Sequence, residues 1–174
     1  MKYLVKFFVV TFLLLVCTHV LAEQKVVYLD MKFILNNSKA GKGAQDFLHK
    51  SFQANQKKFL DNQNALKKEE SYLITQKTIL TKEEYQKKSD NLRKKVIDYQ
   101  SQRRASLDKI ATQRAKSRET LLKAIDPILN TYIKENNISL VIDKKDMLGG
   151  KPEYDITQII VEKLNKELPS LNLK

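Results

Sequence analysis

The chain has very little glycine, proline and cysteine: four glycines, three prolines and one cysteine in 174 residues. No glycine or proline lies between Gly43 and Pro127. Because these residue types interrupt helices, so long a stretch without them, rich in Lys, Gln, Asn, Glu and Ser, predicts a helical arm. Its apolar stripe is thin, so the arm builds almost no core of its own and needs a partner or copies of itself.

The N-terminal residues have the layout of a secretory signal peptide. Lysines precede an almost wholly apolar run, Phe7 to Val16, which is shorter than the ~20 residues that span a bilayer core. We expect residues 1–22 to be removed by cleavage between Ala22 and Glu23; a retained membrane anchor is the alternative. Cleavage removes the only cysteine, Cys17, and so excludes disulfides and cysteine metal sites from the exported chain.

Acidic residues are fewer than basic residues. The chain has 32 Lys and Arg against 20 Asp and Glu, which gives a net charge of +12 at pH 7. A field of this sign attracts acidic polypeptides, anionic lipid head groups or nucleic acid. Export makes nucleic acid the least favoured of these partners.

Short segments on either side of the arm predict strands. Lys25 to Met31 begins with a β-branched and aromatic run typical of a buried strand, after which Asp30 is expected to cap a short helical turn. Ile138 to Asp143 alternates in a way that predicts a second strand. The strand residues that we expect to build an oligomerisation body are Val26, Val27, Tyr28, Leu29, Ile138, Leu140, Val141 and Ile142.

The C-terminal residues predict a turn and then a helix. Gly149 and Gly150 mark the turn and leave open a short third strand near Met147–Gly150. Asp155 is predicted as the N-cap of a terminal amphipathic helix, with Gln158 as its capping partner three residues on.

The first helix of the arm is predicted to begin near Ala44, after a break at Asn36 to Gly43. Apolar residues then recur at seven-residue intervals, as in one position of a coiled-coil seam. They are Phe52, Phe59, Leu66 and Leu73. The companion positions include Asn55, Asn62 and Glu69, so the seam is half polar and the arm is expected to be loosely zipped.

A turn and a second helix complete the arm. The turn is expected at Gln76 to Leu80, and Thr81 with Glu84 then matches a capping box, which starts a helix at Lys82. This helix should run antiparallel to the first and end near Asn136. Pro127 is expected either to kink it or to open a new segment.

The predicted fold is α+β and mainly α, with a long antiparallel helical hairpin inserted into a small β-containing body. The expected boundaries are residues 1–22 for the signal peptide, 23–43 and 128–174 for the discontinuous body, and 44–127 for the arm. So small a body is marginal as a lone core and has strand edges to cover. Oligomerisation through the body would cover them.

Groups that catalyse reactions are scarce. After the predicted cleavage the chain keeps one histidine, His49, and it has no glycine-rich phosphate-binding loop. Neighbouring acidic pairs such as Glu69–Glu70 do not face each other on a helix. We therefore expect no enzymatic activity, no metal site and no cofactor.

The positive charge is concentrated on the arm, where tyrosines and scattered leucines and isoleucines add small apolar patches. Weak, distributed contacts of this kind suit a partner without a fixed shape, such as an unfolded acidic chain. The arm residues expected to contact that partner are Arg93, Lys94, Lys95, Arg103, Arg104, Arg114, Lys116 and Arg118.

The ordered set of terminal segments resembles the Skp/OmpH family of periplasmic chaperones. The matching segments are KVVYLDM at 25–31, NISLVID at 137–143 and DIT at 155–157, behind a signal peptide. The resemblance covers residues 25–168. It implies a jellyfish-like homotrimer, in which strands of the bodies form a β core and the helical hairpins hang from it as tentacles around a basic cavity.

The resemblance also implies a function. The expected protein is an ATP-independent holdase of the periplasm that binds unfolded outer-membrane proteins in the cavity, prevents their aggregation and aids their delivery to the outer membrane. An anionic lipid or lipopolysaccharide surface is a further expected partner, and specific nucleic-acid binding is not expected. The alternatives are a secreted structural coiled-coil protein or adhesin, which would have a fuller seam, and a basic nucleic-acid binder.

Overall fold

The computed structural model describes residues 24–173. The predicted signal peptide, its cleavage site at Ala22 and Glu23, and Cys17 lie outside the described residues. The elements are, in order, β1 Lys25–Leu29, α2 Met31–Asn37, α3 Lys39–Thr75, α4 Lys82–Glu135, β2 Ile138–Asp143, the 3₁₀ helices η1 Lys144–Asp146 and η2 Pro152–Tyr154, and α5 Thr157–Glu167. This mainly helical chain with a small sheet confirms the predicted fold class.

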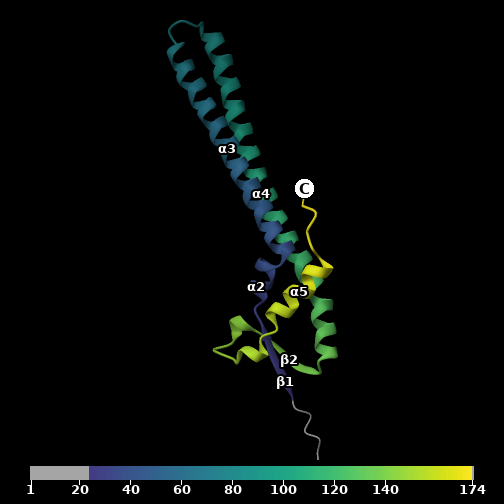
Figure 1. Cartoon of the computed structure of the whole chain (residues 1–174). Coiled ribbons are helices and arrows are strands. Elements are labelled where there is room, and N and C mark those ends of the chain that lie inside the picture. Colours follow the sequence, from purple (N-terminus) through teal and green to yellow (C-terminus); the bar gives the residue numbers. More distant parts are fainter. Residues whose placement is uncertain (1–23, 174) are drawn as a thin grey trace, which may run out of the picture.

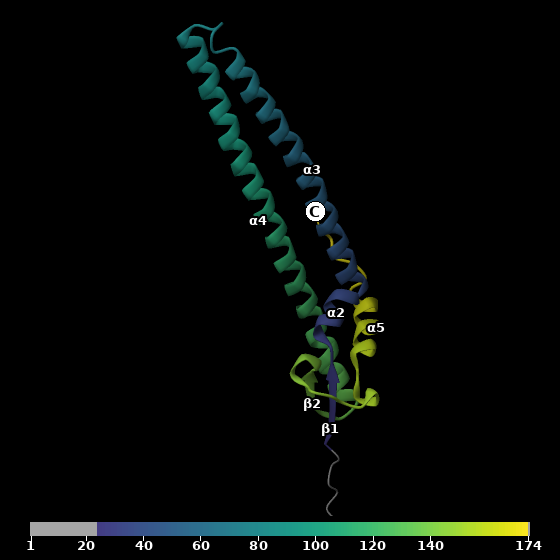
Figure 2. The same ribbon diagram turned by 90° about the vertical axis from the view of Figure 1, so that its left-hand side faces the viewer.

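The molecule has a small body and a long arm (Figure 1). β1, α2, β2 and α5 gather around the C-terminal end of α4, while α3 and the rest of α4 run away from them side by side. The view turned by 90° shows the same hairpin, with its turn far from the body (Figure 2). The antiparallel helical hairpin is therefore present as predicted.

The sheet consists of β1 and β2, which pair in parallel. Val26 lies opposite Leu140 and Tyr28 opposite Ile142, with an irregularity in register next to Lys25. Parallel neighbours cannot be joined by a tight turn and need a crossover connection. Here the crossover is the whole helical arm, so the pairing of both predicted strands also fixes where the arm begins and ends.

One apolar core holds the body together. Its most buried side chains come from β1 (Leu29), α2 (Ile34), α4 (Ile125) and α5 (Ile160 and Leu164). Burial of a large aliphatic side chain contributes about 1.5–3 kcal/mol. The root of the arm is thus packed into the body, because α4 supplies part of the core.

Pro127 lies inside α4, which continues through it. Ile125 and Ile128, on either side of the proline, are both buried in the core. The packing of this turn outweighs the backbone hydrogen bond that a proline removes. No new segment begins at Pro127.

α3 begins at Lys39, and the predicted start near Ala44 is wrong. Ser38 is the N-cap, and its hydroxyl accepts a hydrogen bond from the backbone N–H of Gly41 at 3.2 Å. The side-chain oxygen of Asn165 in α5 accepts another from the backbone N–H of Lys39 at 2.6 Å. These partners satisfy free N–H groups at the helix start, so the helix forms in spite of its glycines.

The turn at the far end of the arm agrees with the prediction. Residues 76–80 form a turn, and α4 begins at Lys82. The hydroxyl of Thr81 accepts from the backbone N–H of Glu84, and the Glu84 carboxylate accepts from the backbone N–H of Thr81 at 3.1 Å. The predicted capping box is confirmed.

The cap predicted for the last helix is only partly correct. α5 begins at Thr157, and the residue at its N-cap, Ile156, has no side-chain cap. The Asp155 carboxylate accepts from the backbone N–H of Thr157 at 2.9 Å, one residue earlier than a capping box requires. The reason is tertiary, since the backbone N–H of Ile156 donates to the carbonyl of Tyr28 on β1.

The third strand that the sequence left open is not formed in the part of the chain that the structure describes. Residues 147–151 have no strand, and η2 begins at Pro152. A single bridge between Tyr28 and Asp155 occupies the edge of β1 away from β2. β1 therefore has a partner on both edges, and β2 has one on a single edge.

Candidate functional site

The basic residues predicted to contact a partner all lie on α4 and are exposed. From Arg93 to Arg118 they extend over roughly 38 Å of helix, at 1.5 Å per residue. The structure therefore does not bring them together in one patch. They form a long charged surface that runs from the root of the arm toward its tip.

Some of these cations have acidic partners and others do not. The Lys95 ammonium contacts both oxygens of Glu69 on α3, at 2.6 and 2.8 Å, and so ties the two helices together. Arg93 lies 3.6 Å from Asp90. Among the described residues, the remaining predicted cations have no ion-pair partner, and their positive charge is available to a ligand.

The seam between the helices is held by few apolar contacts. Phe59 packs edge to face against Tyr99, with ring centroids 6.0 Å apart, and Leu73 and Ile110 are buried. Phe52, which the heptad pattern placed in the seam, is 42% exposed. The prediction of a loosely zipped arm holds, and its root is more open than the pattern indicates.

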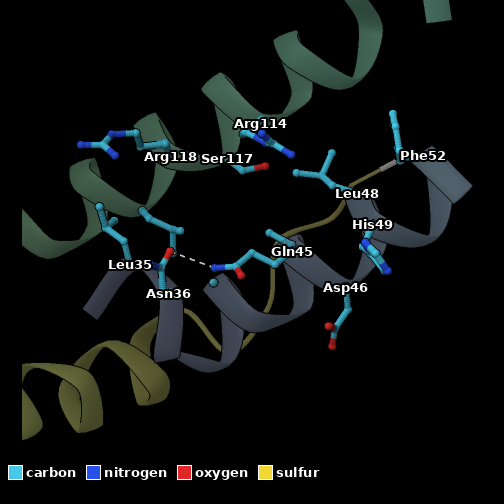
Figure 3. A pocket seen from close by; sticks show the side chains of 13 residues that line it. Leu35, Asn36, Gln45, Asp46, Leu48, His49, Phe52, Arg114, Ser117 and Arg118 are labelled. Carbon is cyan, nitrogen blue, oxygen red and sulfur yellow. Dashed lines mark hydrogen bonds between the residues drawn. The ribbon is translucent and has the colours of Figure 1, made fainter. Parts of the chain in front are cut away.

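A cleft of about 570 Å³ lies between α3 and α4 at the root of the arm (Figure 3). Buried Leu48 and Leu121 are part of its lining, together with the half-exposed ring of Phe52. Arg114 and Arg118, two of the predicted cations, also line it. The cleft thus combines an apolar floor with exposed guanidinium groups.

Polar groups at the root cleft are used internally or turned away. The Gln45 amide donates to the side-chain oxygen of Asn36 at 2.9 Å. Asp46, the acidic residue of the lining, points away from α4 in Figure 3. Within the described chain, neither arginine of this cleft forms an ion pair.

Further clefts flank the seam nearer the tip. One, of about 530 Å³, is lined by Leu66, Ile74, Tyr99 and Arg93, among others. Another, of about 610 Å³, is lined by Tyr72, Lys88, Lys94 and Lys95, among others. The arm therefore offers shallow, mixed apolar and basic surfaces along its length.

The residues predicted for the oligomerisation body differ in their burial. Val27, Leu29 and Ile138 are buried in the chain's own core, and Tyr28 is buried as well. Val26 and Leu140, which face each other across the ladder, are 40% and 53% exposed. Val141 and Ile142 are partly buried. The exposed pair leaves an apolar surface on the sheet that other residues of the described chain do not cover.

The pKa values of two carboxyl groups on the arm are lowered. Hydrogen bonds from the backbone and the hydroxyl of Thr81 lower the pKa of Glu84, and a hydrogen bond from Lys123 lowers that of Glu119. No group of three or more His, Cys, Asp or Glu in residues 24–173 is placed to hold a metal ion. None of the helices described has the length and apolar character to cross a bilayer.

The roles of several structural residues were not predicted from the sequence. Asn165 and Thr157 of α5 bond to the starts of α3 and α2, and Gly41 allows α3 to approach α2 closely. Thr157 belongs to the DIT segment, but no local pattern reveals the bonds of Thr157 or Asn165, because their partners lie more than a hundred residues away. The glycine could have been flagged, since a glycine inside a helix often has a packing reason.

Comparison with known proteins agrees with this architecture. The family described as outer membrane protein (OmpH-like) matches residues 25–164. The Skp-like protein of Pseudomonas aeruginosa is 22% identical over 166 residues, which cover 95% of this chain and 99% of that protein.

A solved structure has the same fold. The crystal structure of an OmpH-like outer membrane chaperone from Caulobacter crescentus superposes with a TM-score of 0.80, at 18% identity, over 90% of this chain and 93% of that one. The family match spans most of the chain, and the two structures share one fold over most of their length. The chain belongs to the OmpH-like family of outer membrane proteins, the Skp/OmpH family that its terminal segments resemble.

Proposed function

We propose that this protein is an ATP-independent holdase chaperone of the periplasm, which keeps unfolded outer-membrane proteins soluble until they are inserted. A chaperone role is supported by the family and by its relatives, one of which is described as an outer membrane chaperone. The observation that carries the proposal is the arm itself, an exposed basic hairpin with a half-polar seam. Several of its cations have no ion-pair partner within residues 24–173. Such a surface attracts acidic, unfolded chains and makes weak contacts with them.

The proposed assembly is a homotrimer. The apolar surface at Val26 and Leu140 and the free edge of β2 support association of the bodies, since both would otherwise stay exposed. The arms of the subunits would then surround a basic cavity that encloses the client. In this proposal residues 23–43 and 128–174 assemble, and residues 44–127 hold the client.

The proposed location follows from the N-terminal sequence and the family. Residues 1–22 would direct export and be cleaved between Ala22 and Glu23. The basic arms would also favour an anionic lipid or lipopolysaccharide surface, where clients are delivered. No catalytic group, metal or cofactor is part of the proposal.

The test is suppression of aggregation. An unfolded β-barrel membrane protein is diluted out of urea without ATP, and light scattering is recorded with the exported protein, with no addition, and with polylysine of equal total charge. We expect the protein, and not polylysine, to keep the client soluble. Aggregation at the same rate in all samples, with the protein verified as folded, would contradict the proposal and favour a structural coiled-coil protein.

A further inference from the structure

The two long sides of the arm differ in chemistry. In a coiled-coil hairpin, residues seven apart on one helix lie on nearly the same side of that helix. The residues of α4 can therefore be grouped into rows with this spacing. One such row begins in the 530 Å³ cleft near the tip and ends in the root cleft. Its members are Arg93, Gln100, Leu107, Arg114 and Leu121.

A matching row on α3 connects the same clefts. Asp46 lines the root cleft, and Lys67 and Ile74 line the 530 Å³ cleft. Leu60 lies between them at a multiple of seven from each. Both clefts therefore open on one side of the hairpin, which we name the arginine side.

The opposite side has lysines at the equivalent places. Lys88 and Lys95 line the 610 Å³ cleft, and steps of seven from them lead toward the root. The lysines of this row are Lys88, Lys95, Lys109, Lys116 and Lys123. On α3 the corresponding row contains Lys58 and Tyr72. We name this surface the lysine side.

Exposed apolar residues follow the same division. Leu60, Ile74 and Leu107 belong to the rows of the arginine side, and Phe52 lines its root cleft. A second row on this side leads to Arg118 in the root cleft; it contains Ile97, 57% exposed, and Arg104. Tyr72 is the large apolar residue exposed on the lysine side of the described arm.

The two sides carry different kinds of cation. Each side has paired charges: Lys95 and Lys123 each contact a carboxylate at 2.6 Å, and Arg93 lies 3.6 Å from Asp90. Each side also has cations without an ion-pair partner among the residues described, which are Lys109 and Lys116 on the lysine side and Arg104, Arg114 and Arg118 on the arginine side. A guanidinium is weakly hydrated and binds carboxylates with two parallel hydrogen bonds, whereas an ammonium is a strongly hydrated point charge.

We propose that the arm binds its client on the arginine side, by holding extended segments in which carboxylates lie next to apolar side chains. The carboxylates pair with Arg104, Arg114 and Arg118, and the apolar side chains enter the root cleft and cover Leu60 and Leu107. The lysine side stays hydrated and contributes only a long-range field. This inference rests on the proposed holdase function and assigns that function to one side of the hairpin.

Paired charge variants test the assignment. Arg104→Gln with Arg114→Gln and Lys88→Gln with Lys109→Gln each remove two exposed charges from α4. In the light-scattering assay we expect the arginine pair to raise several-fold the concentration of protein needed for half protection. The lysine pair should change it less than twofold. Equal effects of the two pairs would overturn the assignment.

Cross-linking locates the client directly. No cysteine follows Cys17 in the sequence, so single cysteines can be placed on the arm of a Cys17→Ser protein. A photoactivatable label on Leu60→Cys or Leu107→Cys should capture an unfolded β-barrel client several-fold more than the same label on Lys58→Cys or Lys109→Cys. Equal capture on both sides by a protein that still prevents aggregation would overturn the assignment and leave the holdase function standing. If the unlabelled protein gives no protection, the holdase function fails and the assignment with it.

Discussion

A close backbone approach at Gly41 determines how the arm leaves the body. A Cβ atom at this position would lie 2.0 Å from the carbonyl oxygen of Leu35 and 2.9 Å from the hydroxyl of Ser38. No side chain fits there unless α2 and α3 move apart. Gly43, two residues on in the same helix, has nothing within 4 Å of such an atom.

These two glycines make a matched pair. We expect Gly41→Ala to destabilise the protein by about 1–3 kcal/mol, because the clash is with backbone that cannot turn aside. Gly43→Ala should instead stabilise it by about 0.5–1 kcal/mol, since alanine is the better helix former. Urea unfolding followed by circular dichroism measures both, and a stable Gly41→Ala protein would contradict the proposed packing.

Thr157 joins the last helix to the start of α2. Its hydroxyl accepts a hydrogen bond from the backbone N–H of Asp30 at 2.8 Å, and Thr157 is 8% exposed. Thr157→Val keeps the shape but leaves this N–H without a partner, so we expect a loss of about 1–3 kcal/mol in the free energy of unfolding. Thr120→Val, at an exposed hydroxyl bonded within its own helix, should cost less than about 0.5 kcal/mol. Similar losses at both positions would refute a special role for Thr157.

At the scale of elements, the capping box at Thr81 decides where the arm turns back. Thr81→Ala should weaken the start of α4 by about 1 kcal/mol, because the N–H of Glu84 loses its acceptor. The expected result is faster amide hydrogen exchange in residues 76–86, with exchange near the root unchanged. Thr78→Ala, in the same turn, is the control, and equal acceleration in the two variants would argue against the cap.

The same cap should depend on pH. Hydrogen bonds from Thr81 hold the pKa of Glu84 below its ordinary value of 4.5. A carboxyl group whose pKa is lowered by folding stabilises the fold above the ordinary pKa, and this contribution is lost as the pH falls through the lowered one. We therefore expect protection of the tip amides, corrected for intrinsic exchange, to fall below pH 4.5. A Glu84→Gln protein that shows the same fall would rule out this carboxylate as the cause.

Elements with local signals were predictable from the sequence. The β-branched run predicts β1, the alternation predicts β2, and the Thr81–Glu84 pair predicts the start of α4. In each case the residues responsible lie within a few positions of one another. The starts of α3 and α5 were not, because they depend on distant partners. Asn165 supports the first, and the bond from Ile156 to Tyr28 shifts the second.

The exposure of the candidate site residues was predictable from the sequence, but their surroundings were not. The basic residues named from the sequence do lie exposed on α4, as their helical context indicates. The sequence does not show that Phe52 leaves the seam and lines a cleft with Arg114, because that depends on how α3 and α4 separate at the root. It also does not show which cations are neutralised, as Lys95 is by Glu69.

At the scale of the whole molecule, the net positive charge should make client binding sensitive to salt; it is +12 for the full sequence and +10 without Lys2 and Lys6 of the predicted signal peptide. The Debye length falls from about 10 Å at 0.1 M to about 3 Å at 1 M ionic strength, so the field of the arm is screened while apolar contacts persist. We expect weaker binding and slower association at 1 M NaCl, without complete loss. Binding that is unchanged by salt would show that the charge of the arm plays no part.

The most direct test of the account uses the absence of tryptophan from the chain. An unfolded β-barrel client that contains tryptophan is titrated with the exported protein without ATP, and client fluorescence and its quenching by acrylamide are recorded. We expect a saturable, salt-sensitive change in fluorescence, with reduced quenching and a client that stays soluble and unfolded. If the client precipitates and its fluorescence does not change, although the added protein is folded and lacks residues 1–22, the proposed holdase function is contradicted.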